Sequence, residues 1–123
     1  MMTGSITADK EAALSMIVRG PHGQEEHVEA IIDTGFNGFM VLPAPLVATL
    51  GLPYHTRTMA TLADGTSVTL AIYQATIVWH GRDRSVYVLE AEDGPLIGMA
   101  LLYGNRVTLD VVDGGPVTVT ELP

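Results

Sequence analysis

Apolar and polar residues alternate along much of the chain, in short runs separated by turns that contain glycine. A period of two is typical of strands that bury one face, and these runs are rich in Val, Ile and Thr, which favour strands. The first two runs cover residues 12–18 and 26–32, with a turn signal at residues 20–23. The pattern predicts a mostly β protein that begins with a hairpin.

The same pattern continues to the end of the chain. Further strands are predicted at residues 39–42, on both sides of Asp64 and Gly65, and at 76–80, 85–89, 96–98, 106–112 and 116–120. A short helix is predicted over residues 45–50, because Pro45 stands near its start and Gly51 follows its end. A second helical turn is predicted after Gly98. The expected fold is a barrel of short strands with one or two short helices.

Composition narrows the class of protein. The chain has 123 residues, a hydrophobic content of 47% and a mean hydropathy of +0.30, which indicates one folded domain over residues 1–123. No apolar run is long enough to span a membrane, and the N-terminus has no secretory pattern, so a cytoplasmic location is expected. The net charge of -8 argues against nucleic acid and membrane surfaces as partners. The absence of cysteine excludes thiolate catalysis.

One predicted strand ends on an acid. The stretch IIDTGFNG places Asp33 directly after two branched apolar residues and before Thr34 and Gly35. A carboxylate at the end of a buried strand is costly unless it is hydrogen-bonded, so it is either an ordinary turn residue or a group placed for chemistry. Gly35 would allow a tight turn whose N–H donates to the carboxylate.

The order of three segments resembles the retropepsin-like (retroviral-type) aspartic proteases, and among them the small bacterial members. The segments are IIDTGFNGFMVL at residues 31–42, TLADGTSVTL at 61–70 and LIGMALL at 96–102. The resemblance implies a closed β-barrel in which Asp33, Thr34 and Gly35 form the catalytic turn. It also implies a substrate groove lined by residues after this turn, by a hairpin flap and by the third segment, namely Phe36, Asn37, Gly38, Ala63, Asp64, Gly65, Ile97 and Gly98.

Simpler interpretations stay open for parts of this site. Asn37 and Gly38 also fit an ordinary loop, and the tip from Ala63 to Gly65 also fits a surface hairpin that closes over nothing. Gly98 is expected to be structural in either case, because it allows close packing behind the acid.

The chain contains one Asp-Thr-Gly triplet. Hydrolysis of an amide requires one group that accepts a proton from water and another that donates one, and two carboxylates sharing a proton supply both. A lone aspartate is ionised at neutral pH and has no proton to donate. The second acid must therefore come from a second chain, which predicts a homodimer with Asp33 facing its symmetry mate. The last strand, in residues 115–123, is expected to offer an unpaired edge to the partner.

The predicted function is an aspartic endopeptidase that acts on peptides or unfolded polypeptides and needs no cofactor. The competing hypothesis is a dimeric peptide-binding or scaffold module with the same fold and no turnover. No metal site is expected, because His22, Glu26 and His27 lack the spacing of a zinc motif and lie in a turn that enters a strand.

Overall fold

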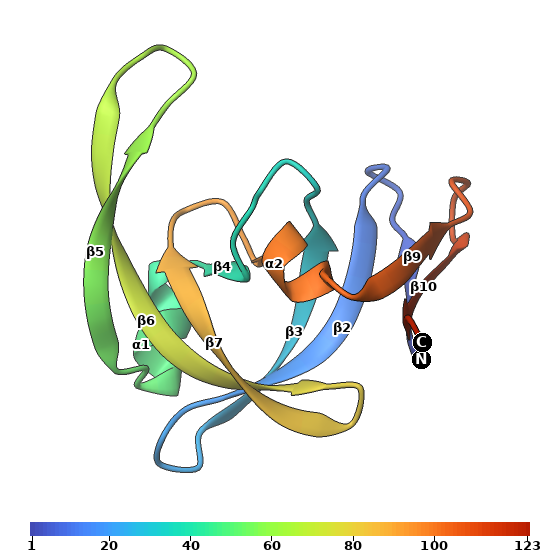
Figure 1. Cartoon of the computed structure of the whole chain (residues 1–123), viewed down its shortest axis with the longest axis horizontal. Helices are drawn as coiled ribbons and strands as arrows, with labels where there is room; N and C mark the ends of the chain where they lie inside the picture. The colour runs from blue at the N-terminus through green and yellow to red at the C-terminus, as the bar shows by residue number, and fades with distance from the viewer.

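The computed structural model describes all 123 residues and contains ten strands and two short helices (Figure 1). Neither helix is long and apolar enough to cross a membrane. The elements in chain order are β1 (Met2–Ile6), β2 (Ala12–Arg19), β3 (Glu25–Ile32), β4 (Met40–Leu42), α1 (Ala44–Leu50), β5 (Tyr54–Thr61), β6 (Ser67–Trp79), β7 (Arg82–Glu90), β8 (Leu96–Ile97), α2 (Met99–Leu102), β9 (Asn105–Leu109) and β10 (Pro116–Glu121).

The strands form one sheet in the order β5-β6-β7-β4-β8-β3-β2-β1-β10-β9. Strand β6 also pairs with β2, where Val18 lies opposite Ile77, and this contact closes six of the strands into a barrel. Pairing is parallel between β3 and β8 and between β4 and β7, and antiparallel elsewhere. The predicted mostly β barrel with two short helices is confirmed.

The barrel interior follows from the alternation seen in the sequence. Leu14, Met16 and Val18 of β2 are buried, and so are every second residue at the end of β6 and in the middle of β7. Together with residues of the other barrel strands and both helices they form one core cluster of 19 buried side chains. No polar or charged residue is buried, so the core carries no desolvated charge.

Helix α1 lies where the sequence predicted it and starts one residue earlier. Pro43 precedes it in an extended conformation, and Gly51 ends it in the left-handed region with φ 59°. The Gly51 N–H donates to the carbonyl oxygen of Ala48, which satisfies a helix end that would otherwise lack a donor.

The hairpin between β6 and β7 differs from its prediction. Its turn consists of His80 and Gly81, with φ of 52° and 75°, in place of the four residues 81–84. A two-residue turn in which both residues have positive φ matches the twist of the two strands. Histidine seldom adopts a positive φ, which is why His80 was predicted to belong to the strand. Strand β6 is also one continuous strand of 13 residues that serves two hairpins, whereas the sequence predicted two separate strands.

The chain ends are the largest correction. Strand β1 was not predicted, and it pairs with both β2 and β10. Strand β10 pairs with β1 on one side and with β9 on the other, so the edge expected to be free for a partner is already occupied within the chain. Strand β9 ends at Leu109, three residues earlier than predicted. The free edges of the sheet are β5 and β9.

Candidate active site

Asp33 follows the last residue of β3 and is held in place by the neighbouring strand. Parallel pairing puts Ile32 beside Ile97, and the Asp33 N–H donates to the carbonyl oxygen of Ile97 at 2.9 Å. The backbone then turns, and the Phe36 N–H donates to the carbonyl oxygen of Asp33 at 3.2 Å. These two bonds fix the direction in which the half-buried Asp33 side chain leaves the barrel.

The Asp33 carboxylate accepts one hydrogen bond within the chain. The Gly35 N–H donates to Oδ1 at 2.9 Å, as the sequence predicted. A Cβ atom on Gly35 would stand only 3.2 Å from that oxygen, so glycine leaves the room for this close approach. Thr34 between them is exposed, and its hydroxyl bonds to no other group of the chain. The turn therefore presents one carboxylate oxygen and one hydroxyl without intrachain partners.

The loop after the turn packs on the start of α2. The N–H groups of Met99 and Ala100 donate to the carbonyl oxygens of Phe36 and Gly38, at 2.8 and 3.1 Å. A Cβ on Gly98 would collide with the Gly38 carbonyl oxygen and the Phe36 ring. Gly98 therefore permits the close packing expected behind the acid, and the ring of Phe36 covers the same two glycines. Ile97 is fully buried, while Asn37 is exposed.

A cavity of about 460 Å³ opens beside Asp33. It is lined by Glu11, Glu29, Ile31, Asp33, Asp93, Gly94, Pro95 and Leu96. The acids at positions 11, 29 and 93 were not predicted from the sequence to belong to the site. Glu29 could have been found from the sequence. Side chains two residues apart on a strand share a face, so Glu29 and Ile31 lie on the same side as Asp33. The other two come from separate turns that only the fold brings together.

The predicted flap residues lie apart from Asp33. Figure 1 shows the β5–β6 hairpin projecting from the barrel, with its tip separated from the loop that follows β3. At the tip, Asp64 Oδ1 accepts hydrogen bonds from the Thr66 hydroxyl at 2.6 Å and the Thr66 N–H at 2.9 Å. These bonds lower the pKa of Asp64, the hydroxyl first and the backbone N–H second. Gly65 has φ 87°, which only glycine adopts readily.

A second cavity of about 740 Å³ lies beneath this hairpin. Its walls are Leu62, Val68 and Leu70 from the hairpin, the start of α1 from Pro43 to Pro45, and Glu90, Ala91 and Glu92. The β7–β8 loop thus contributes Glu92 to this cavity and Asp93 to the cavity beside Asp33. The two cavities therefore share the β7–β8 loop as a wall.

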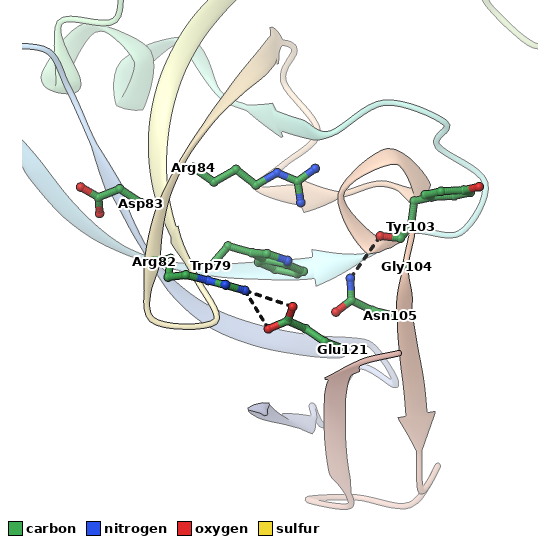
Figure 2. Close-up of a pocket in the computed structure, with 8 residues that line it drawn as sticks. All are labelled: Trp79, Arg82, Asp83, Arg84, Tyr103, Gly104, Asn105 and Glu121. Carbon is green, nitrogen blue, oxygen red and sulfur yellow. Dashed lines mark hydrogen bonds and ion pairs between the residues drawn. The ribbon is translucent and has the colours of Figure 1, made fainter. Parts of the chain in front are cut away.

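A third cavity, of about 400 Å³, contains none of the predicted site residues (Figure 2). Its arginine at position 82 donates from Nη2 to both carboxylate oxygens of Glu121, at 3.0 Å each. The Asp83 carboxylate points away from the cavity, and it accepts from Arg19 at 2.7 Å. Most charge around this cavity is therefore neutralised within the chain, in contrast to the acids beside Asp33.

Comparison with known proteins supports the fold. No protein-family model matches the sequence, and no curated protein matches it. The structure is similar to that of the EIAV protease complexed with the inhibitor HBY-793, with a TM-score of 0.61 and 18% sequence identity. The match covers 77% of this chain and 88% of the viral one. The protein therefore has the retropepsin-like fold of the retroviral proteases.

Proposed function

We propose that this protein is an aspartic endopeptidase that acts as a homodimer. The observation that carries the proposal is the Asp33 turn: a half-buried carboxylate anchored by the Gly35 N–H, opening onto a cavity, in a retropepsin-like barrel. In the dimer, Asp33 of each protomer would face the other across the two-fold axis. One carboxylate accepts a proton from water as it attacks the peptide carbonyl, and the other donates a proton to the carbonyl oxygen.

The exposed Thr34 hydroxyl supports this arrangement. It has no partner within the chain, although it stands next to the proposed catalytic carboxylate. Across a two-fold axis the same hydroxyl would meet the turn of the second protomer and hold the two Asp33 side chains at a fixed separation. That separation matters, because two carboxylates share a proton only at short range.

We infer that the partner adds at β9, the free edge at the chain-end side of the sheet. The Asp110 N–H donates to the carbonyl oxygen of Pro116, and the Leu122 N–H donates to that of Gly104. With the register of the two strands, these bonds show which residues of β9 point their backbone groups toward β10 and which point them away. In an antiparallel ladder, every second residue turns its N–H and C=O outward. Leu109 is one of these outward residues and is 41% exposed. Val111 and Val112 beyond it are also exposed, so an apolar surface adjoins the free edge.

The proposal is tested by incubating the protein with an unfolded polypeptide from acidic to neutral pH, beside Asp33→Asn. We expect cleavage by the wild type and a loss of about 10²–10⁴-fold or more in the variant, because an amide cannot exchange protons as a carboxyl does. Asp83→Asn, which removes an aspartate distant from the turn, is the matched control and should keep activity. Cleavage that persists in Asp33→Asn would refute the assignment. Absence of cleavage by either protein, with peptide binding retained, would establish the silent binding module.

A further inference from the structure

The cavity beneath the β5–β6 hairpin combines apolar walls with two carboxylates. Leu62, Val68 and Leu70 form one side, and prolines at the start of α1 form another. The carboxylates are those of Glu90, which is half-buried, and Glu92, which is exposed at the rim. A ligand that fits must therefore offer apolar surface along its length and a polar group at its end.

No cation of the chain neutralises these carboxylates. The lining includes no Lys, Arg or His, and the ion pairs of the chain involve Glu25, Asp83 and Glu121 only. The adjacent cavity beside Asp33 is lined by four acids and likewise by no basic residue. Carboxylates in the two cavities that share the β7–β8 loop produce a negative potential that attracts cations.

We propose that the cavity beneath the hairpin binds a lysine or arginine side chain of the polypeptide substrate. Long basic side chains carry an apolar stem and a charged head, and the two parts prefer different surroundings. The stem would lie against Leu62, Val68 and Leu70, and the cation would approach Glu90 and Glu92. The inference rests on the proposed function, in that one polypeptide must reach both the cavity beneath the hairpin and the cavity beside Asp33.

A binding measurement tests this without turnover. The Asp33→Asn protein is titrated with two fluorescent, unstructured peptides that differ at one position, lysine in one and norleucine in the other. Norleucine keeps most of the apolar stem and lacks the charge. We expect the lysine peptide to bind at least about fivefold more tightly, with the difference shrinking as salt rises.

Two matched variants locate the effect. Glu92→Gln, added to Asp33→Asn, should reduce the lysine preference at least about threefold, whereas Glu26→Gln, which removes the same charge from the start of β3, should leave it unchanged. Both residues lie outside the core, so the fold should be retained, and thermal unfolding checks this. Equal binding of the two peptides, equal effects of the two variants or no binding at all would overturn the inference.

The outcome is separable from that of the proposed activity. A lysine preference that depends on Glu92 in a protein that never cleaves would retain the subsite and refute the peptidase. Cleavage that depends on Asp33 but shows no preference for lysine would retain the peptidase and refute the subsite.

Discussion

At one end of the molecule, around the β6–β7 turn, arginines and acids are paired. Arg19 binds Glu25 and Asp83, and Arg82 binds Glu121. At the other end, shown at the top of Figure 1, the loop after β3 and the β5–β6 hairpin border two cavities lined by acids without a basic residue. Exposed ion pairs contribute little to stability, and unpaired acids side by side repel one another. The charges at the first end are therefore neutralised within the chain, whereas the acids at the second end remain free to attract a cation from outside it.

The two ends differ in whether basic residues of the chain lie beside the acids. The whole chain has six lysine and arginine residues, and none of them lines either of the two cavities that share the β7–β8 loop. An acid-lined cavity can bind a cation that a ligand supplies, which is the basis for the proposed lysine subsite.

The largest effect is expected from a change in the backbone packing behind Asp33. In Gly98→Ala, the added methyl group would collide with the Gly38 carbonyl oxygen, so the loop after Asp33 must move. We expect the free energy of unfolding to fall by about 1–3 kcal/mol, as in overpacked cores, and activity to fall with it. Chemical denaturation measures the first effect, and peptide cleavage the second.

Gly81→Asn is the control at the opposite end. Open space surrounds Gly81, and asparagine tolerates the left-handed conformation of the β6–β7 turn, so the loss should stay below about 1 kcal/mol. A Gly98→Ala protein as stable and active as wild type would show that the Asp33 loop does not depend on this packing.

The proposed dimer can be weakened by a substitution in β9, away from the acid-lined cavities and from the ion pairs. Leu109→Pro removes an N–H of β9 that points away from β10. The hydrogen bonds between β9 and β10 are kept, because they are made by the residues before and after Leu109. If the partner adds at this edge, the dimer dissociation constant should rise about tenfold or more, and specific activity should fall in parallel. Sedimentation across a concentration series, read beside cleavage rates, measures both.

Leu109→Ala is the control for this change, since it removes the same side chain and keeps the N–H. The dimer should be weakened less by alanine than by proline. Equal dimer populations for wild type and Leu109→Pro would place the interface elsewhere.

A smaller effect is expected from the ion pairs. Arg82→Gln removes a pair whose side chains are 72% and 53% exposed, so the free energy of unfolding should change by less than about 1 kcal/mol. Peptide binding should be unchanged as well, because Arg82 lines the cavity of Figure 2 and neither of the two acid-lined cavities. Urea denaturation and the peptide titration provide the two measurements. A large loss of peptide binding would mean that the two ends are coupled.

The parts of the structure that the sequence predicted are those set by neighbouring residues. The Asp33 turn follows from the conformational freedom of glycine and the short reach of an aspartate side chain. Helix α1 follows from Pro45 and Gly51 at its ends. Gly98 was expected to allow close packing behind the acid, and the structure leaves no room for a Cβ atom there.

The parts that the sequence did not predict depend on distant pairing. Strand β10 contacts β1 from the opposite end of the chain, and nothing local distinguishes a strand with two partners from one with a free edge. Glu11 and Asp93 share a cavity with Asp33 because separate turns meet there. Whether Asp33 and the β5–β6 hairpin act in catalysis stays a prediction, as do the dimer and the single-domain assignment.

The smallest expected effect concerns the tip of the β5–β6 hairpin. Hydrogen bonds from Thr66 hold the pKa of Asp64 below its usual range. Because the folded pKa lies below the unfolded one, the ionised carboxylate stabilises the turn above the unfolded pKa, and this stabilisation is lost as pH falls through the folded value. Thr66→Val removes the hydroxyl, the larger cause, and should raise the pKa of Asp64 toward its ordinary value, so that the tip loosens at a higher pH. Carboxyl NMR titration and amide exchange at the tip would measure both changes, with Thr58→Val on exposed β5 as a control that should move neither. An unchanged Asp64 titration in Thr66→Val would show that the Thr66 hydroxyl does not order this tip.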